Sequence, residues 1–64
     1  MTTEDVKKII EKWHQKRNTW PTKCELEMAL VTEGFTVDSV ELDELLAMLQ
    51  TANTLHIVKG TFVI

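Results

Sequence analysis

Grouped carboxylates are the side chains whose spacing first suggests chemistry. Asp38, Glu41, Asp43 and Glu44 lie close together, but they lack the alternation of oxygen ligands that a calcium-binding loop requires. No Ser/His/Asp or Cys/His set that could support nucleophilic catalysis stands out in the sequence. We therefore interpret these acids by their charge: they either dock a basic partner or keep the surface hydrated.

The single cysteine and the two histidines, Cys24, His14 and His56, show no metal-binding spacing. The sequence contains no Cys-x-x-Cys, His-Glu-x-x-His or His-x-His motif. Its two glycines, Gly34 and Gly60, fit a helix end and a hairpin turn, so a glycine-rich phosphate loop is absent as well. The sequence therefore predicts a non-enzymatic protein with no metal and no cofactor.

Charge is distributed unevenly along the chain, whose net charge is −3. Residues 1–23 carry six basic and three acidic side chains, a net charge of +3. Residues 24–64 carry one basic and seven acidic side chains, a net charge of −6. An asymmetry of this kind indicates where partners of each charge could bind.

The basic half contains a candidate ridge for phosphate contacts. Lys8, Lys12 and Lys16 are spaced four residues apart, which aligns them along one side of a helix, although Glu11 interrupts the patch. Ordinary surface lysines are the alternative interpretation. The candidate nucleic-acid-binding residues are Lys8, Lys12, Lys16, Arg17 and Lys59.

Capping residues and apolar spacing predict three helices. The first runs from about Thr3 to Arg17, with a threonine as its N-cap and acids in its first turn. The second opens with a capping box at Thr22 and ends at Gly34. The third begins after Asp38 and ends near Asn53.

The last ten residues, 55–64, predict a tight β-hairpin with the two-residue turn Lys59-Gly60. This register places Ile57 opposite Phe62, and strand alternation places both on one face with Leu55 and Ile64. An isolated hairpin is marginal in water, so we expect this face to pack on the helices.

The final strand is expected at a sheet edge, where it could pair with a partner's strand or with a second copy of the chain. Alternatively, Trp20 and its neighbours cover that edge, since the residue before Pro21 is disfavoured in a helix and favoured in an extended segment.

The hydrophobic pattern defines one core within a single domain, residues 1–64. The predicted core residues are Val6, Ile9, Ile10, Trp13, Leu26, Leu30, Phe35, Leu42, Leu46, Leu49, Leu55, Ile57, Phe62 and Ile64. The N-terminus is polar and acidic, unlike a secretory signal, and no apolar run approaches the roughly 20 residues of a membrane span. We therefore expect a soluble, cytoplasmic protein with no membrane partner.

The order of helix, short extended segment, helix, turn, helix and hairpin resembles the winged helix-turn-helix family. Thr22 to Leu26 resembles the start of that family's second helix, and residues 55–64 resemble a short wing. The spacing of Leu42, Leu46 and Leu49 resembles the apolar spacing of the family's third helix, and Asn53 resembles the small residue that ends it. The resemblance implies an α+β fold, a three-helix winged helix-turn-helix with a C-terminal β-hairpin wing. The stretch from Leu26 to Leu42 is longer than the family pattern, so a looser turn is expected there.

In that family the third helix usually enters the DNA major groove and the wing contacts phosphates or the minor groove. Here the outer side of the third helix carries no Arg, Lys, Asn or Gln near its start, and Asp43 and Glu44 would repel phosphates. We therefore expect a regulatory or adaptor module that binds mainly a protein. The candidate protein-binding residues are Ser39, Val40, Asp43, Glu44, Ala47 and Met48.

Three alternatives remain open at this point. The first is a DNA-binding transcriptional regulator that contacts phosphates through the first helix and the wing. The second is an inhibitor that presents the acidic third helix as a decoy to a nucleic-acid-binding protein. The third concerns assembly: Val40, Met48, His56 and Val63 could form an apolar patch that is buried in a homodimer, or they could be scattered surface hydrophobes.

Overall fold

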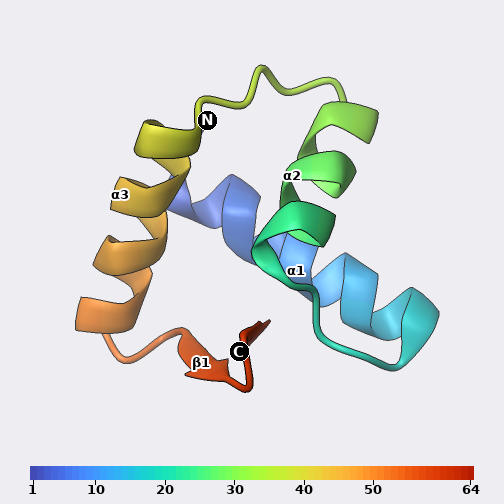
Figure 1. Cartoon of the computed structure of the whole chain (residues 1–64), viewed down its shortest axis with the longest axis vertical. Coiled ribbons are helices and arrows are strands. Elements are labelled where there is room, and N and C mark those ends of the chain that lie inside the picture. The colour runs from blue at the N-terminus through green and yellow to red at the C-terminus, as the bar shows by residue number, and fades with distance from the viewer.

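The computed structural model describes all residues of the chain, 1–64. Three helices are followed by two antiparallel strands (Figure 1): α1 (Thr3–Arg17), α2 (Lys23–Thr32), α3 (Ser39–Thr51), β1 (His56–Val58) and β2 (Thr61–Val63). α1 crosses behind α2 and α3 and contacts both of them, and the hairpin lies at the lower edge of the view. The predicted α+β fold with a winged-helix layout is confirmed. None of the helices has the length and apolar character needed to cross a membrane.

The first two helices begin with reciprocal capping boxes. The Thr2 hydroxyl accepts the Asp5 backbone N–H at 3.4 Å, and the Asp5 carboxylate accepts the Thr2 N–H at 3.0 Å. Thr22 and Glu25 repeat this arrangement at the start of α2, at 3.4 and 3.1 Å. Each box satisfies two backbone donors that have no partner within the helix, so the polar sequence itself fixes where these helices start.

Left-handed residues end α2 and α3. Gly34 has φ +90°, and the next N–H, that of Phe35, donates back to the carbonyl of Leu30 at 3.0 Å. Asn53 takes the same conformation after α3, with φ +58°. The predicted helix end at Gly34 is confirmed, and residues 33–38 form the long connection between α2 and α3.

The hairpin has the predicted register. Its facing pairs are His56 and Val63, Ile57 and Phe62, and Val58 and Thr61. Lys59 and Gly60 both have positive φ, +52° and +79°, which a two-residue turn of type I′ requires.

The two edges of the hairpin differ. Along β2, the Phe62 N–H donates to the Pro21 carbonyl at 2.9 Å, and Thr22 forms an isolated bridge with Thr61. The segment that covers β2 was predicted at Trp20 and its neighbours, and the residues that contact the strand are the next two, Pro21 and Thr22. Of the two alternatives for the final strand, the structure supports the covered one, and the open edge of the sheet is β1.

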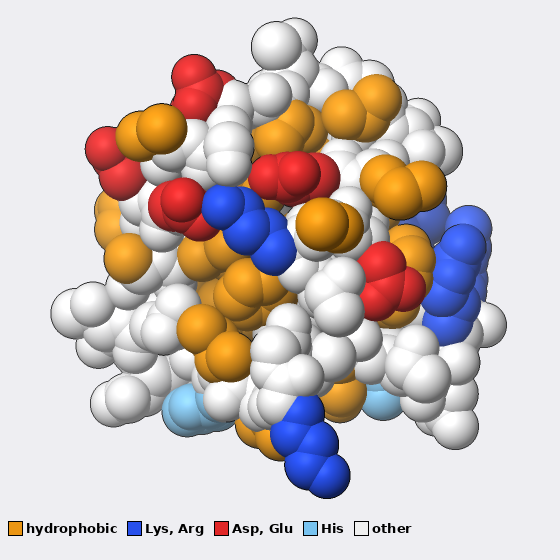
Figure 2. Space-filling view, viewed as in Figure 1, with side chains coloured by type: hydrophobic (Ala, Val, Ile, Leu, Met, Phe, Trp, Pro, Cys, Tyr) orange, Lys and Arg blue, Asp and Glu red, His pale blue; other side chains and the backbone are white.

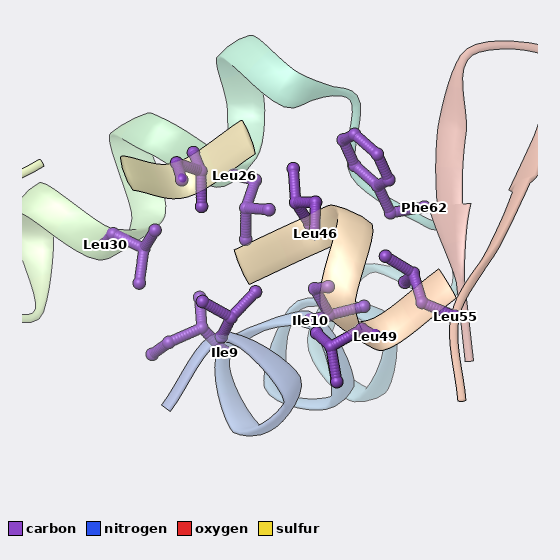
Figure 3. Packing of buried hydrophobic residues seen from close by; sticks show 10 residues of the cluster. Ile9, Ile10, Leu26, Leu30, Leu46, Leu49, Leu55 and Phe62 are labelled. Carbon is purple, nitrogen blue, oxygen red and sulfur yellow. The ribbon is translucent and has the colours of Figure 1, made fainter. Parts of the chain in front are cut away.

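Ten buried hydrophobic residues form the core, and the predicted core contains all ten of them. They are Val6, Ile9, Ile10, Leu26, Leu30, Leu42, Leu46, Leu49, Leu55 and Phe62. Figure 3 shows side chains from the three helices and the hairpin converging in the space between them. Burial of this cluster is the main favourable contribution to the stability of the fold.

Four other predicted core residues lie outside this cluster. Phe35 and Ile64 are partly buried and pack against it. Trp13 is half-buried and packs under Arg17 instead, because the C-terminal half of α1 extends past α2 (Figure 1). The prediction that Ile57 belongs to the core is wrong, since Ile57 is 54% exposed. β2 lies between β1 and the segment at Pro21, so Phe62 reaches the core whereas its partner on β1 does not.

Candidate functional site

The outer face of α3 is set by the way this helix starts. The Asp38 carboxylate accepts the backbone N–H groups of Val40 at 2.8 Å and Glu41 at 3.3 Å. This cap fixes where the helix starts, and burial of Leu42, Leu46 and Leu49 in the core sets which side faces outward. All six candidate protein-binding residues are exposed on the opposite side: Ser39, Val40, Asp43, Glu44, Ala47 and Met48.

Two large apolar side chains stand on this face, one on each side of an acid. Val40 is 67% exposed and Met48 is 59% exposed. Glu44 lies between them, four residues from each, so the three side chains follow one line along the helix. Figure 2, drawn in the same view as Figure 1, shows acidic side chains gathered at the upper left over the first turns of α3. The face therefore combines apolar contact area with negative charge.

Lys23 joins the start of α2 to this acidic face. Its ammonium lies 2.6 Å from the Asp43 carboxylate and donates to the Ser39 hydroxyl at 3.2 Å. The hydrogen bond to Asp43 raises the pKa of Lys23 above its ordinary value of 10.5. Asp43 and Ser39 thus have a partner within the molecule, and Glu41 and Glu44 remain as the unpaired acids of the helix.

Sequence reasoning missed this role of Lys23, which it counted only as part of the basic half. The lysine lies 16 residues from Ser39 in the sequence, and no local pattern connects the two. The contact follows from the packing of both helices on α1, which brings the first turn of α2 to the first turn of α3.

The candidate nucleic-acid-binding residues of α1 are all exposed, but two of them have internal partners. Lys12 forms an ion pair with Glu33 just after α2, and this hydrogen bond holds the pKa of the Glu33 carboxyl below its ordinary value of 4.5. The Arg17 guanidinium lies over the Trp13 ring, 4.0 Å from its centroid, in a cation–π contact. Of the three lysines of the predicted ridge, only Lys12 thus links α1 to another segment, since Trp13 and Arg17 both lie on α1.

The other three cations, Lys8, Lys16 and Lys59, have no carboxylate partner in the structure. Lys8 and Lys16 stand on α1, whereas Lys59 stands at the tip of the hairpin turn. In Figure 2 basic side chains gather at the right of the view, on the side away from the acidic first turns of α3. The charge asymmetry of the sequence is therefore also an asymmetry of the surface.

Aromatic stacking holds the link between α1 and α2. The imidazole of His14 and the indole of Trp20 are parallel, with an interplanar angle of 4° and centroids 3.8 Å apart. This contact links the last turns of α1 to the segment that leads into α2. No group of three or more His, Cys, Asp or Glu side chains is placed to hold a metal ion.

The outer side of α2 is an exposed apolar surface that sequence reasoning did not identify. Met28 and Val31 are 69% and 61% exposed, and Cys24 is exposed beside them. They border an open hollow of about 580 Å³ that reaches Val37 and Ser39. The sequence feature that could have revealed this surface is the composition of residues 23–32, which places apolar residues on both sides of the helix.

A second hollow, of about 250 Å³, lies between α1 and α2. Its cationic residues are Lys12, Lys16 and Arg17, and Trp13 and Met28 supply apolar lining. Glu33 also lines this hollow, so its charge is mixed.

Comparisons with known proteins found no match: no family model matches the chain, and neither do the curated proteins or the solved structures that were searched.

Proposed function

We propose that this chain is a small, non-enzymatic regulatory or adaptor module that binds a protein partner through the outer face of α3. The observation that carries the proposal is the line of Val40, Glu44 and Met48 along the helix. Two large apolar side chains are exposed to solvent there, one on each side of Glu44. Exposed apolar residues with a polar surround are the usual composition of a protein-binding patch.

The composition of this face defines the partner's chemistry. Val40 and Met48 require apolar contacts, and methionine adapts its shape to the surface that it meets. Glu41 and Glu44 favour lysine or arginine at the rim of the partner's site, where charge chiefly guides association and selects the partner. The partner surface is therefore apolar at its centre and basic around it.

The same composition disfavours DNA as the ligand of α3. Phosphate contacts dominate the affinity of DNA-binding proteins and require cations. The cation nearest to this face, Lys23, is already paired with Asp43. Insertion of α3 into a major groove would bring Glu41 and Glu44 towards phosphates without compensation.

Site-specific photo-cross-linking in the native host tests the proposal. A photo-reactive amino acid is placed at Met48 in one variant and at Lys8 in a matched variant, since both positions are exposed on helices. We expect a discrete protein adduct from position 48 and none from position 8. An adduct from position 8 alone, or from neither position, would contradict the proposal.

A DNA-binding regulator is the second candidate, favoured by the unpaired cations Lys8, Lys16 and Lys59. An amide-shift NMR titration with random-sequence duplex DNA at low salt, repeated at high salt, tests it. Salt-sensitive shifts at these three lysines would support phosphate binding. Absence of shifts at low salt, where electrostatic affinity is strongest, would exclude DNA as the main ligand.

A decoy inhibitor is a special case of the leading proposal, in which the partner is itself a nucleic-acid-binding protein. Competition distinguishes it: a decoy displaces nucleic acid from the captured partner, and a simple adaptor does not. The Glu44→Lys variant should lose this displacement if α3 is the decoy surface.

A further inference from the structure

The hairpin has one protected edge and one exposed edge. β2 is covered by Pro21 and Thr22, whereas nothing pairs with the outer side of β1. Two neighbouring residues of β1 are also unusually exposed for apolar side chains, Ile57 at 54% and Val58 at 49%. Figure 1 shows β1 at the lower end of the molecule, beyond the last turn of α3. An uncharged strand edge of this kind is a template for pairing with another strand.

The register identifies which backbone groups are free. In an antiparallel pair, residues alternate between exchanging hydrogen bonds with their partner and directing their N–H and C=O away from it. Phe62 directs its N–H away from β1, because that group donates to Pro21. Its partner Ile57 must therefore direct its own N–H and C=O away from β2, to the open edge.

We propose that β1 pairs with β1 of a second copy, antiparallel, around a two-fold axis at Ile57. In this arrangement the N–H and C=O of Ile57 exchange two hydrogen bonds with the same groups of Ile57 in the other copy. His56 of each copy then lies opposite Val58 of the other. The product is a four-stranded antiparallel sheet in the order β2, β1, β1, β2.

Self-complementarity argues for a second copy as the occupant. Ile57 has one free backbone donor and one free acceptor at this edge. An antiparallel second copy places the same acceptor and donor of its own Ile57 opposite them, so the same surface serves on both sides, as an isologous interface requires. Residues 52–64 contain no Asp or Glu. The proposed interface therefore lies away from the acidic surface, which would repel a second identical chain. Two exposed isoleucines also meet across the axis, a favourable cross-strand pair.

The covered edge of β2 limits the assembly to two copies. Once both β1 edges are joined, the outer strands of the new sheet are β2 strands, and Pro21 and Thr22 already occupy them. The interface therefore closes as a dimer instead of growing into a fibre. Because each copy contributes a strand of only three residues, the dimer is small and its formation depends on protein concentration.

Sedimentation equilibrium over a concentration series measures the association, with Ile57→Lys as the test variant. Like charges directly opposite each other disfavour a strand pair, so we expect Ile57→Lys to weaken association at least about fivefold. Val31→Lys is the matched control, because Val31 is a similarly exposed apolar residue on α2, and this variant should associate as the wild type does. Circular dichroism verifies that both variants fold.

A backbone variant separates strand pairing from general hydrophobic association. A chain of 64 residues is accessible to chemical synthesis, and N-methylation of Ile57 removes one donor per copy while keeping the side chain. Since this N–H has no partner within the fold, N-methylation should weaken association about tenfold or more and leave the monomer folded.

NMR of a mixed-label sample defines the register directly. The proposed pairing predicts a contact between the Hα of His56 in one copy and the Hα of Val58 in the other. A wild-type chain that stays monomeric at every concentration would overturn the proposal. So would unchanged association of Ile57→Lys or of the N-methylated chain, or inter-copy contacts at another surface.

Discussion

The outer face of α3 and the ridge of α1 are both charged stripes on exposed helices, yet the fold uses them differently. On α1, Lys12 is paired with Glu33 and Arg17 lies over Trp13, whereas Lys8 and Lys16 are unpaired. On α3, Asp43 is paired with Lys23, but Glu44 faces solvent between two exposed apolar side chains, Val40 and Met48, without an internal partner. The contrast teaches that the availability of a charged stripe depends on residues far away in the sequence, which either engage its side chains or leave them free.

The largest expected effect separates the two sides of α3. Leu42 is fully buried in the core, so Leu42→Ala should cost about 2–5 kcal/mol of unfolding free energy, enough to unfold much of so small a domain. Val40→Ala on the outer face should change stability by no more than about 0.5 kcal/mol. Urea denaturation measures both. A large loss from Val40→Ala would mean that the outer face is structural and not free for a partner.

The next largest effect on stability is expected at Thr22, the N-cap of α2, the helix that begins with Lys23. Thr22→Ala removes the hydroxyl that accepts the Glu25 N–H, and the expected cost is about 1 kcal/mol. Thr22→Ser keeps the hydroxyl and should recover most of the loss. Thermal denaturation compares the two, and equal melting temperatures for Thr22→Ala and the wild type would show that the capping box contributes little here.

A smaller effect should appear in acid, at the ion pair that occupies the α1 ridge. The pKa of Glu33 is lowered by its hydrogen bond to Lys12, so the stabilisation is present above the ordinary pKa of 4.5 and is lost as the pH falls through the lowered value. Lys12→Gln should return the Glu33 pKa towards 4.5, as followed by carboxyl carbon NMR. An unchanged pKa would mean that Lys12 is free for other ligands.

The smallest effect lies at the acidic face. The pKa of Lys23 is raised chiefly by its hydrogen bond to Asp43, so this contribution is present below the ordinary pKa of 10.5 and is lost as the pH rises through the raised value. Asp43→Asn should lower the Lys23 pKa towards 10.5 in an NMR titration of the lysine side chain. Glu44→Gln is the control and should leave the Lys23 pKa unchanged.

Local sequence signals predicted most of the fold. The threonine cap of α1, the capping box at Thr22, the left-handed Gly34 and the Lys59-Gly60 turn act over a few residues, so their types and spacing are sufficient to place them. The reciprocal bond that makes a capping box of Thr2 and Asp5 was not predicted. The hairpin register followed from the turn in the same way. These are short-range effects, which a single sequence records.

The errors concern contacts between distant segments. Ile57 and Phe62 share a face, but only Phe62 reaches the core, because Pro21 pairs with β2 and leaves β1 at the edge. The pairing of Lys23 with Asp43 also depends on how two helices pack on a third. Strand alternation and helical periodicity define faces, but they do not determine which part of a face another segment covers.

We propose that α3, and not α1, is the binding surface of this protein. Isothermal titration of the partner captured from position 48 tests it with two charge reversals, Glu44→Lys on α3 and Lys8→Glu on α1. We predict that Glu44→Lys weakens binding about tenfold or more, as expected when a central contact of an interface is lost, and that Lys8→Glu changes it by less than about twofold. The opposite pattern, with Lys8→Glu as the damaging change, would contradict the claim.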